Sequence, residues 1–291
     1  METVETEHYT IHNDDCVEAM SRMPADSVDL SVFSPPFEAL FTYSSEREDM
    51  GNASGSEEFA AHFTFFAREL LRVLKPGRHC CLHLTQLVNF RTQQGRKGIR
   101  DFRGRTINAM EDAGFHFYGE FVIPKNPQAV ALRTKTERLQ FTQFKRDSLE
   151  SSPCLNDYML QFRKPGKQAE KVLNDVSNDE WIKWASGIWS DIRESDVLSG
   201  WMGAKGEGDE KHICPLQLEV IRRCVRLWTN PGEVVFSPFA GIGSELFVAI
   251  EQKRRALGVE LKPEYFRQAV ANARSSVDRH HRQQDMFAGA R

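Results

Sequence analysis

Apolar positions in this chain follow two periods, one typical of strands and one typical of helices. Apolar runs that suit buried strands recur, and between them apolar side chains fall three and four residues apart, as on one face of a helix. Pro76-Gly77 ends the clearest helical stretch. Strands alternating with helices predict an α/β protein with a doubly wound sheet. The predicted strands are 28–33, 115–123, 158–162, 233–236 and 255–259, and the predicted helices are 59–74, 106–113 and 245–251.

A glycine-containing loop lies between the predicted strand 233–236 and the predicted helix 245–251. Its glycines let the backbone approach a ligand closely, and the helix start offers unpaired N–H groups. The next strand ends at Glu260, whose carboxylate can accept both hydroxyls of a ribose. Leu246 stands where a dinucleotide site has its third glycine, which favours a nucleoside without phosphates. The alternative is a tight turn without a ligand, followed by a glutamate that only caps a strand.

A stiff turn, Ser34-Pro35-Pro36-Phe37, directly follows the apolar run 28–33. Its two prolines fix φ at roughly −65° and remove two backbone donors, so carbonyls there point outward without partners. A hydroxyl, a carbonyl and a ring face can together receive a flat polar object such as a nucleobase with its amine. The alternative is a plain loop start, which is what a strand ending in Pro-Pro more often marks.

In this order, the two segments resemble the motifs of DNA amino-methyltransferases, which methylate an exocyclic base nitrogen with S-adenosylmethionine. The turn is similar to their [Asp/Asn/Ser]-Pro-Pro-[Tyr/Phe/Trp] motif, and Ser237-Pro238-Phe239-Ala240-Gly241-Ile242-Gly243-Ser244 is similar to their Asp-Pro-Phe-x-Gly-x-Gly loop. Asn13-Asp14-Asp15-Cys16 resembles their opening stretch, whose Asp contacts the cofactor adenine, and Lys211-His212 resembles the start of the helix before the loop. Because the catalytic motif comes first, the resemblance is to the circularly permuted β class. Ser237 departs from the pattern, since most members have Asp there.

The resemblance implies direct displacement, in which a base amine held by the Ser34 hydroxyl and the Pro35 carbonyl attacks an activated methyl group. Phe37 would stack on the base once it is flipped out of the duplex. N6 of adenine and N4 of cytosine are both open as the target. The implied catalytic residues are Ser34, Pro35, Pro36 and Phe37, and the implied S-adenosylmethionine-binding residues are Asp15, His212, Ser237, Pro238, Phe239, Ala240, Gly241, Gly243, Ser244 and Glu260.

The fold implied by the resemblance is a Rossmann-like, doubly wound mixed sheet of the class I methyltransferase type, circularly permuted, with an inserted variable region. Residues 8–164 would form the catalytic half, 165–208 the variable target-recognition region, 209–275 the cofactor-binding half and 276–291 a polar tail. The variable region holds four of the five tryptophans. The alternative is that these rings pack a small helical subdomain or a subunit interface.

A net charge of −3 argues against a generally basic DNA-coating protein, but the charge is segregated. Residues 86–105 and residues 125–146 each hold six basic side chains against one acidic side chain. Such stretches can neutralise phosphates, although a solvated charged surface is the alternative. Beside a base-sized catalytic turn we favour contact with double-stranded DNA. The predicted contacts are Arg91, Arg96, Lys97, Arg100, Arg103, Arg105, Lys125, Arg133 and Lys135.

Other sequence features set milder bounds. No apolar run is long enough to span a bilayer and no signal segment follows Met1, so we expect a cytoplasmic protein without membrane contact. The cysteines form no C-x-x-C pair, which argues against a zinc site or a disulfide framework. His79 and His83 share one face of a strand, but without a nearby carboxylate or thiolate pair we interpret them as structural and expect no metal. A homodimer is expected from the resemblance alone.

Other functions share some of these features. Ser237 is compatible with a non-catalytic DNA-binding protein of the same fold, whereas the glycine loop together with Asp15 and Glu260 favours an enzyme that binds its cofactor. Methylation of RNA or of a small molecule would use the same amine chemistry. A nucleotide-dependent oxidoreductase is disfavoured by Leu246.

Overall fold

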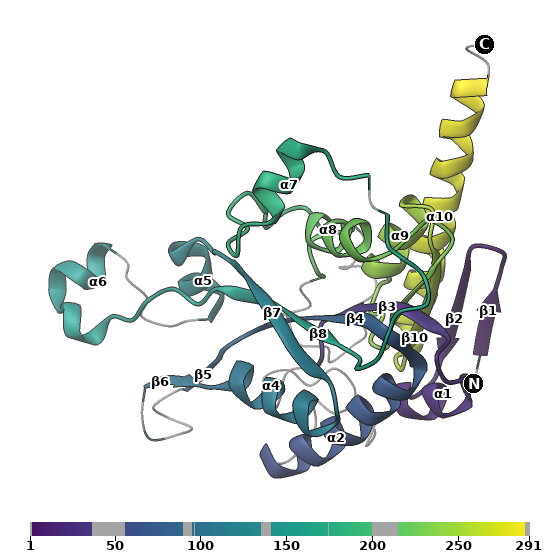
Figure 1. Ribbon diagram of the computed structural model, residues 1–291. Coiled ribbons are helices and arrows are strands. Elements are labelled where there is room, and N and C mark those ends of the chain that lie inside the picture. Colours follow the sequence, from purple (N-terminus) through teal and green to yellow (C-terminus); the bar gives the residue numbers. More distant parts are fainter. Residues whose placement is uncertain are drawn as a thin grey trace.

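An eight-stranded mixed sheet forms the centre of the computed structural model, which describes residues 2–36, 56–89, 95, 97–134, 141–173, 175–199 and 215–288 (Figure 1). The strand order is β1-β2-β10-β9-β3-β4-β8-β7. The five strands from β2 to β4 in this order are parallel to one another, β1 and β8 run antiparallel to their neighbours, and β7 again runs parallel to β4. The strands are β1 Glu2–Glu5, β2 Tyr9–Asn13, β3 Val28–Phe33, β4 Leu74–Thr85, β7 His116–Ile123, β8 Asp157–Arg163, β9 Val234–Ser237 and β10 Arg255–Glu260; β5 Leu87–Asn89 and β6 Gly98–Arg100 form a separate two-stranded sheet.

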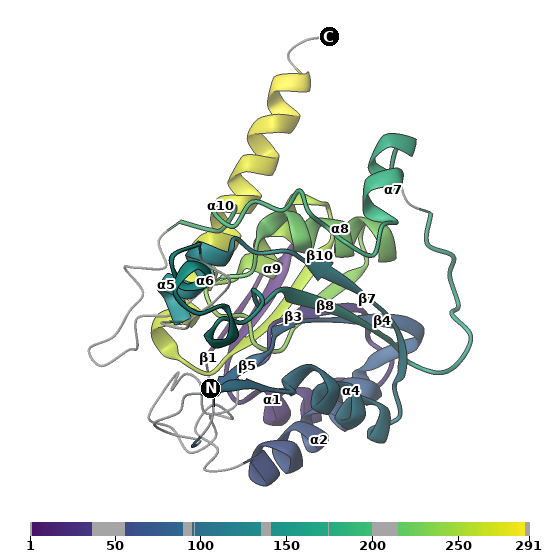
Figure 2. The same cartoon turned by 90° about the vertical axis from the view of Figure 1, so that its left-hand side faces the viewer.

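Helices cover both faces of the large sheet (Figures 1 and 2). In β3, Leu30 and Val32 join a core shared with α8, α9 and α10, whereas Phe33 joins a second core shared with α1, α2 and α4. A strand buried on both faces reads as a continuous apolar run, as residues 28–33 do. The helices are α1 Cys16–Arg22, α2 Ser56–Val73, α4 Phe102–Asp112, α5 Pro127–Thr134, α6 Phe141–Arg146, the 3₁₀ turn η2 Ser148–Glu150, α7 Asn178–Trp184, α8 Leu218–Trp228, α9 Ser244–Glu251 and α10 Pro263–Ala288.

The α/β fold predicted from hydrophobic periodicity is confirmed, with small differences at element ends. The five predicted strands correspond to β3, β7, β8, β9 and β10, and the three predicted helices to α2, α4 and α9. Helix α4 begins earlier than its apolar pattern suggested, because the Asp101 side chain accepts a hydrogen bond from the Gly104 N–H (2.8 Å) and caps it.

Strands from distant parts of the chain lie side by side in the sheet. β9 and β10, near the C-terminus, lie between β2 and β3, near the N-terminus. The predicted catalytic turn after β3 and the predicted glycine loop after β9 therefore start from adjacent strands. The circular permutation implied by the resemblance, and the division into halves at 164, 208 and 275, stay predictions.

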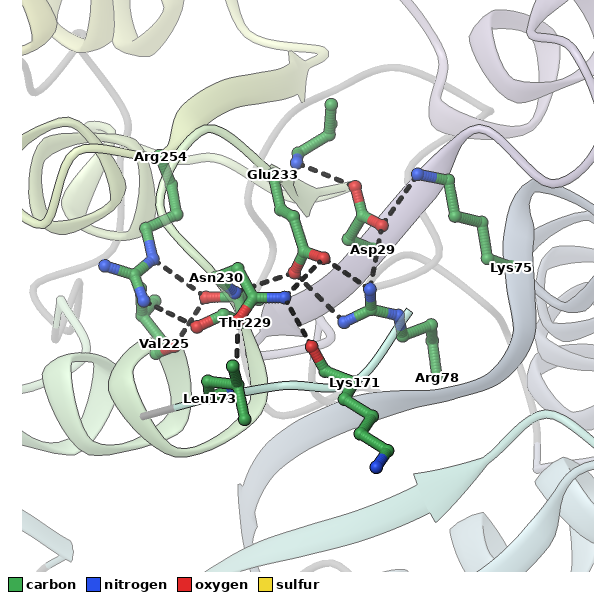
Figure 3. A network of polar contacts seen from close by, with 11 residues as sticks. Asp29, Lys75, Arg78, Lys171, Leu173, Val225, Thr229, Asn230, Glu233 and Arg254 are labelled. Carbon is green, nitrogen blue, oxygen red and sulfur yellow. Dashed lines mark hydrogen bonds and ion pairs between the residues drawn. The ribbon is translucent and has the colours of Figure 1, made fainter. Parts of the chain in front are cut away.

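A network of charged side chains ties the amino ends of β3, β4 and β9 together (Figure 3). Asp29 of β3 accepts hydrogen bonds from Lys75 Nζ (2.7 Å) and from the Val234 N–H (3.0 Å). Arg78 of β4 forms a two-point ion pair with Glu233 and lies 3.5 Å from Asp29. Asp29 and Arg78 are buried, so the network fixes how these three strands are set against one another.

Helix α10 extends through the region that was predicted as a polar tail from residue 276. Ser276 is buried and its hydroxyl donates a hydrogen bond to the Phe247 carbonyl of α9 (2.8 Å). Figure 1 shows the last turns of α10 extending away from the sheet. Across the described part of the chain, no helix has the length and apolar character needed to cross a membrane.

Candidate active site

Three of the segments singled out in the sequence meet at one edge of the sheet. Parallel strands end on the same side, and a ligand in an open α/β sheet binds just beyond their carboxyl ends. Asp15 follows β2, the glycine loop follows β9, and Ser34 follows β3. The strand ends that form this edge are Asn13, Glu260, Ser237, Phe33 and Thr85, in the order of the sheet.

The two glycines of the loop serve different purposes. Gly243, the N-cap of α9, has φ +84°, and a Cβ there would lie 3.1 Å from the Ala269 Cα of α10. Gly241 has φ +53°, but a Cβ there would meet no described atom within 4 Å. Gly243 therefore permits close packing of α9 against α10, while no described atom fills the space beside Gly241 at the carboxyl edge of the sheet.

Buried polar groups without partners surround this loop. The hydroxyls of Ser237, at the end of β9, and Ser244, at the start of α9, are buried and have no hydrogen-bond partner among the described residues. The side chain of Glu245 is buried beside them, and burial, with a contribution from the negative charge of Glu260, raises its pKa to about 8. Unpartnered buried polar groups are costly and uncommon, so the two serine hydroxyls fit a site that a polar ligand completes.

Hydrogen bonds hold the acid predicted to bind ribose against the loop. Glu260 Oε2 accepts from the Gly241 N–H (2.7 Å), and Oε1 accepts from the Lys262 N–H (2.9 Å). The Asn13 amide donates to the Glu260 carbonyl (2.8 Å), which joins the ends of β2 and β10. Asp15 caps α1, where its Oδ1 accepts from the N–H groups of Val17 (2.8 Å) and Glu18 (2.9 Å). Both acids are thus oriented by backbone amides at the same edge.

Aromatic packing connects the loop to the catalytic turn. The Phe239 ring lies 5.6 Å from the Phe33 ring and 4.9 Å from the Phe66 ring of α2, measured between centroids. Phe33 immediately precedes Ser34. The partly buried ring of Phe239 therefore packs against the core and links the two segments.

The hydroxyl of Ser34 begins a chain of side-chain hydrogen bonds. Ser34 Oγ lies 3.0 Å from His83 Nδ1 of β4, and His83 Nε2 lies 3.2 Å from Asp157 Oδ2 of β8. Lys125 Nζ lies 2.8 Å from the same Asp157 oxygen. Burial alone would raise the pKa of Asp157, but its hydrogen bond with His83 and the ammonium of Lys125 outweigh burial and lower that pKa to about 2. Asp157 is therefore a carboxylate at neutral pH.

The structure gives Lys125 a different position from the one predicted for a phosphate contact. Its side chain is only 1% exposed and forms the ion pair with Asp157. An ammonium in this position is not presented to a phosphate at the surface. Lys125 is buried because it follows β7 and its side chain turns inward toward β8. The local excess of basic residues in the sequence does not reveal this direction.

The other histidine of the strand face has a separate environment. His79 Nδ1 lies 3.2 Å from the Phe162 carbonyl, and the ring packs against Tyr118 and Trp228. Burial lowers the pKa of His79 to about 4. The interpretation of His79 as structural agrees with these contacts, whereas His83 joins the side chains around Ser34.

Both basic stretches leave the sheet at the edge that carries Ser34. The stretch 86–105 follows the carboxyl end of β4, and the stretch 125–146 follows the carboxyl end of β7. Val88 of β5 and Val130 of α5 pack together, which brings the two stretches into contact. Lys97 is exposed, and Arg103 forms an ion pair with Glu120 (2.6 Å). Arg100 and Arg105 are half-buried.

Of the three tryptophans that the structure describes in the region 165–208, two are buried and one is exposed. Trp189 is fully buried and stacks on Phe121 of β7, and its indole N–H donates to the Trp184 carbonyl (3.0 Å). The guanidinium of Arg223, in α8, lies over the rings of Trp184 and Trp189. Trp181 is exposed. Trp184 and Trp189 thus attach α7 and the segment after it to the sheet. A role of this region in target recognition stays a prediction.

Several predicted site residues lie outside the described residues. They include Phe37 of the catalytic turn and His212 of the predicted cofactor site. The backbone of Arg133 belongs to α5, but its side chain is not described. The remaining predicted residues outside the described part are Arg91, Arg96 and Lys135.

Glu245 and Asp157 were missed in the sequence, and His83 was interpreted there as structural although its ring contacts Ser34 and Asp157. Glu245 reads as an ordinary acid in the first turn of a helix, although its apolar flanks, Leu246 and Phe247, signal burial. His83 and Asp157 are far apart in the chain and meet only because β4 and β8 pair with a register that places Thr85 opposite Asp157. No local pattern encodes that register, because an antiparallel pair between distant segments is set by tertiary packing.

Comparisons with known proteins agree with this geometry. Residues 28–271 match a family model described as DNA methylase. The putative methylase YubD of Escherichia coli (strain K12) is 23% identical over 87% of this chain and 85% of its own length. The type II methyltransferase M.Cfr9I of Citrobacter freundii is 24% identical over 92% of this chain and 89% of its own. The type II methyltransferase M.BglI of Bacillus subtilis is 28% identical, but the match spans 56% of this chain and 40% of that enzyme.

Solved structures with the same fold include methylases. TTHA0409, a putative DNA modification methylase from Thermus thermophilus complexed with S-adenosyl-L-methionine, superposes with a TM-score of 0.70 at 24% identity, over 92% of this chain and 93% of that one. The cytosine-N4-specific PvuII DNA methyltransferase superposes with a TM-score of 0.64 at 19% identity, over 91% and 86% of the two chains. At these identities the superpositions support the fold.

Proposed function

The chain belongs to the DNA methylase family, and from this premise we propose that it transfers a methyl group from S-adenosylmethionine to an exocyclic amine of a base in double-stranded DNA. The observation that carries the proposal is the position of Ser34. Its hydroxyl lies at the end of β3, beside the β9 strand that leads into the glycine loop, and is held by His83. The hydroxyl that would bind the amine therefore lies next to the loop that would bind the methyl donor.

The residues around the glycine loop fit S-adenosylmethionine. Open space beside Gly241 suits close approach of a ligand, and the Glu260 carboxylate suits the ribose hydroxyls. Asp15, at the end of the adjacent β2, would face the adenine. The unpartnered hydroxyls of Ser237 and Ser244 would find partners on the bound molecule. Ser237 supplies a neutral hydroxyl where the motif that this loop resembles has Asp.

The chemistry follows from positioning. S-adenosylmethionine, when bound, supplies a methyl group already activated by its sulfonium. Ser34 Oγ and the Pro35 carbonyl accept the two N–H groups of the amine, which favours a pyramidal, more nucleophilic nitrogen and fixes its direction. Phe37 stacks on the base after it leaves the duplex and offsets an unstacking cost of about a few kcal/mol. No covalent nucleophile is required.

Contact with DNA is proposed through the basic stretches at the same edge. Lys97 is exposed, and so are Lys145 and Arg146 at the basic end of α6; in this proposal all three would meet phosphates. Half to two-thirds of protein–DNA hydrogen bonds go to the backbone, so these residues would set position rather than sequence. The homodimer and the cytoplasmic location expected from the resemblance stay predictions.

A transfer assay with nucleoside analysis tests the proposal. The protein is incubated with S-adenosylmethionine carrying a radiolabelled methyl group and with unmethylated bacterial DNA, and the DNA is then digested to nucleosides. We expect label in N6-methyladenine or N4-methylcytosine, which also identifies the base. Binding of the cofactor without transfer of label to the DNA would contradict the proposal and favour another substrate or a DNA-binding protein.

A further inference from the structure

The contacts among His83, Asp157 and Lys125 indicate which nitrogen of the His83 ring carries a proton. Asp157 is a carboxylate at neutral pH and can only accept hydrogen bonds, so the His83 Nε2 that faces it at 3.2 Å carries a proton and donates. Lys125 already neutralises that carboxylate from 2.8 Å. The geometry therefore fits a ring whose single proton is on Nε2.

This tautomer determines the direction of the hydrogen bond at Ser34. A neutral imidazole protonated on Nε2 has an unprotonated Nδ1, which can only accept. The Ser34 hydroxyl, 3.0 Å away, must then donate its single proton to His83 Nδ1. Both lone pairs of Ser34 Oγ are left for other donors, and the oxygen is held as an acceptor.

We propose that His83, oriented by Asp157 and Lys125, keeps Ser34 an acceptor for the substrate amine and takes up the proton that the amine releases. This inference rests on the proposed function and adds a residue to it. His83 acts through Ser34 and is a positioning residue, because nothing places its ring against the substrate itself.

The proton balance of the step is complete. When the amine nitrogen forms its bond to the methyl carbon and the bond from that carbon to sulfur breaks, the positive charge passes from sulfur to nitrogen. The nitrogen then loses one proton to Ser34 Oγ as the Ser34 hydroxyl proton passes to His83 Nδ1. The product is a neutral methylated amine, and the imidazolium that results faces the Asp157 carboxylate until it releases its proton to water.

Nothing else described around the ring competes for this role. The ionisable groups that face His83 are Asp157, from β8, and, through Asp157, Lys125 after β7. His79, the other histidine on the same strand face, turns its Nδ1 to the Phe162 carbonyl and contacts neither Ser34 nor Asp157. It is therefore a matched control for a buried ring on β4.

The first test reads the tautomer directly and needs neither DNA nor cofactor. Full-length protein labelled with ¹⁵N in its histidine rings is studied by NMR at neutral pH, and the His83 and His79 signals are assigned by their loss in His83→Asn and His79→Asn. The proposal predicts a protonated Nε2 and an unprotonated Nδ1 for His83, with an Nδ1 signal that moves in Ser34→Ala. A ring protonated on Nδ1, alone or as a cation, would overturn it.

The second test separates proton uptake from simple orientation. Asn at position 83 can offer an oxygen to the Ser34 hydroxyl but cannot take up a proton. We expect the single-turnover rate of His83→Asn to fall by about 10²-fold or more, as loss of an acid–base group does, with the affinities for S-adenosylmethionine and DNA within about threefold of wild type. His79→Asn should keep the wild-type rate, and thermal melting checks that both variants fold.

The two proposals fail in different ways. A wild-type rate in His83→Asn would overturn the role of His83 and leave methyl transfer intact. Absence of methyl transfer in the wild-type protein would overturn the proposed function, while the NMR result would still decide whether His83 holds Ser34 as an acceptor.

Discussion

Single side chains at the carboxyl edge of the sheet owe their chemistry to burial. Glu245 is a buried acid, and its pKa of about 8 means that it is mostly neutral at pH 7. Asp157 is equally buried, but paired groups lower its pKa to about 2. The difference between the two lies in their partners, because Glu245 faces a second negative charge, Glu260, while Asp157 faces Lys125 and His83.

Glu245 predicts a pH dependence of stability. The folded protein holds a proton on Glu245 that the unfolded chain loses above its ordinary pKa of 4.5, so the free energy of unfolding falls as pH rises from 4.5 to about 8. Glu245→Gln removes this titration. We expect urea denaturation to show the variant more stable than wild type at pH 8.5 by about 2–4 kcal/mol, and little different at pH 4.5.

Glu251→Gln, on the exposed end of the same helix, controls for the loss of a carboxylate and should shift stability by under about 1 kcal/mol. If Glu245→Gln changed stability equally at both pH values, the buried neutral carboxyl would be disproved.

Gly241 and Gly232 provide a matched pair for the ligand site. Both have positive φ, and a Cβ at either would meet no described atom within 4 Å, but Gly232 lies before β9, at the opposite edge of the sheet. Each substitution by Ala should cost about 1–2 kcal/mol in backbone strain. Calorimetric titration should show S-adenosylmethionine affinity lowered at least about tenfold in Gly241→Ala only, because the methyl group enters the space a ligand would use. Equal affinity in the two variants would argue against a ligand beside Gly241.

At the scale of elements, the order of the strands determines where the site lies. A network of charged side chains at the amino ends of the strands holds them in their relative positions. Asp29, Arg78 and Glu233 join β3, β4 and β9 at the edge opposite Ser34 (Figure 3). Because strands are stiff, their relative positions at one end determine the distance between Ser34, His83 and the glycine loop at the other.

Arg78→Met tests this network. It leaves Glu233 without its buried partner, so we expect the free energy of unfolding to fall by about 3–5 kcal/mol in urea denaturation. Arg222→Met, which removes a partly exposed pair with Glu219 and Glu251, should cost about 1 kcal/mol or less. Similar losses of unfolding free energy in the two variants would show that the Arg78 network stabilises the fold no more than a surface ion pair does.

Five of the strands and three of the helices could be predicted from the sequence because their periodicity is local. The strands β3, β7, β8, β9 and β10 are runs of apolar residues, and α2 repeats its apolar positions every three or four residues. Helix α10 was not among the predicted helices, and its residues from 276 on were predicted to form a polar tail because most of them are polar. Polar helical residues carry a weaker signal than apolar ones.

The site was only partly predictable, for a different reason. Ser34, the glycine loop and Glu260 follow strands directly, so the parallel order of those strands was enough to bring them together. His83, Asp157 and Lys125 come from β4, β8 and the segment after β7, where antiparallel pairing decides which side chains meet. The same register makes Lys125, predicted to contact phosphate, a buried partner of Asp157.

At the scale of the whole molecule, two basic stretches lie on the side of the sheet that carries the site, although the net charge of the chain is −3. The basic stretches after β4 and β7 leave from the carboxyl edge, and Figure 1 shows β5, β6, α5 and α6 on the same side of the sheet. A DNA duplex bound there would present a flipped base to Ser34 while its phosphates meet the basic side chains.

Lys97 tests that placement. We expect Lys97→Ala to weaken binding to DNA of any sequence and to lower the slope of log K against log salt by about 0.9, the value for one phosphate contact. Lys171→Ala, an exposed lysine near the opposite edge, should change neither quantity. Fluorescence anisotropy at several salt concentrations measures both. An unchanged slope in Lys97→Ala would place the DNA elsewhere.

The central claim is that the turn after β3 performs methyl transfer beside the glycine loop, and one comparison tests it most directly. Single-turnover methyl transfer to DNA is measured for wild type, for Ser34→Ala and for Ser27→Ala, which removes a hydroxyl at the other end of β3. We predict a fall of about 10²-fold or more in Ser34→Ala, with S-adenosylmethionine affinity unchanged, and a wild-type rate in Ser27→Ala. A near-normal rate in Ser34→Ala would contradict the account.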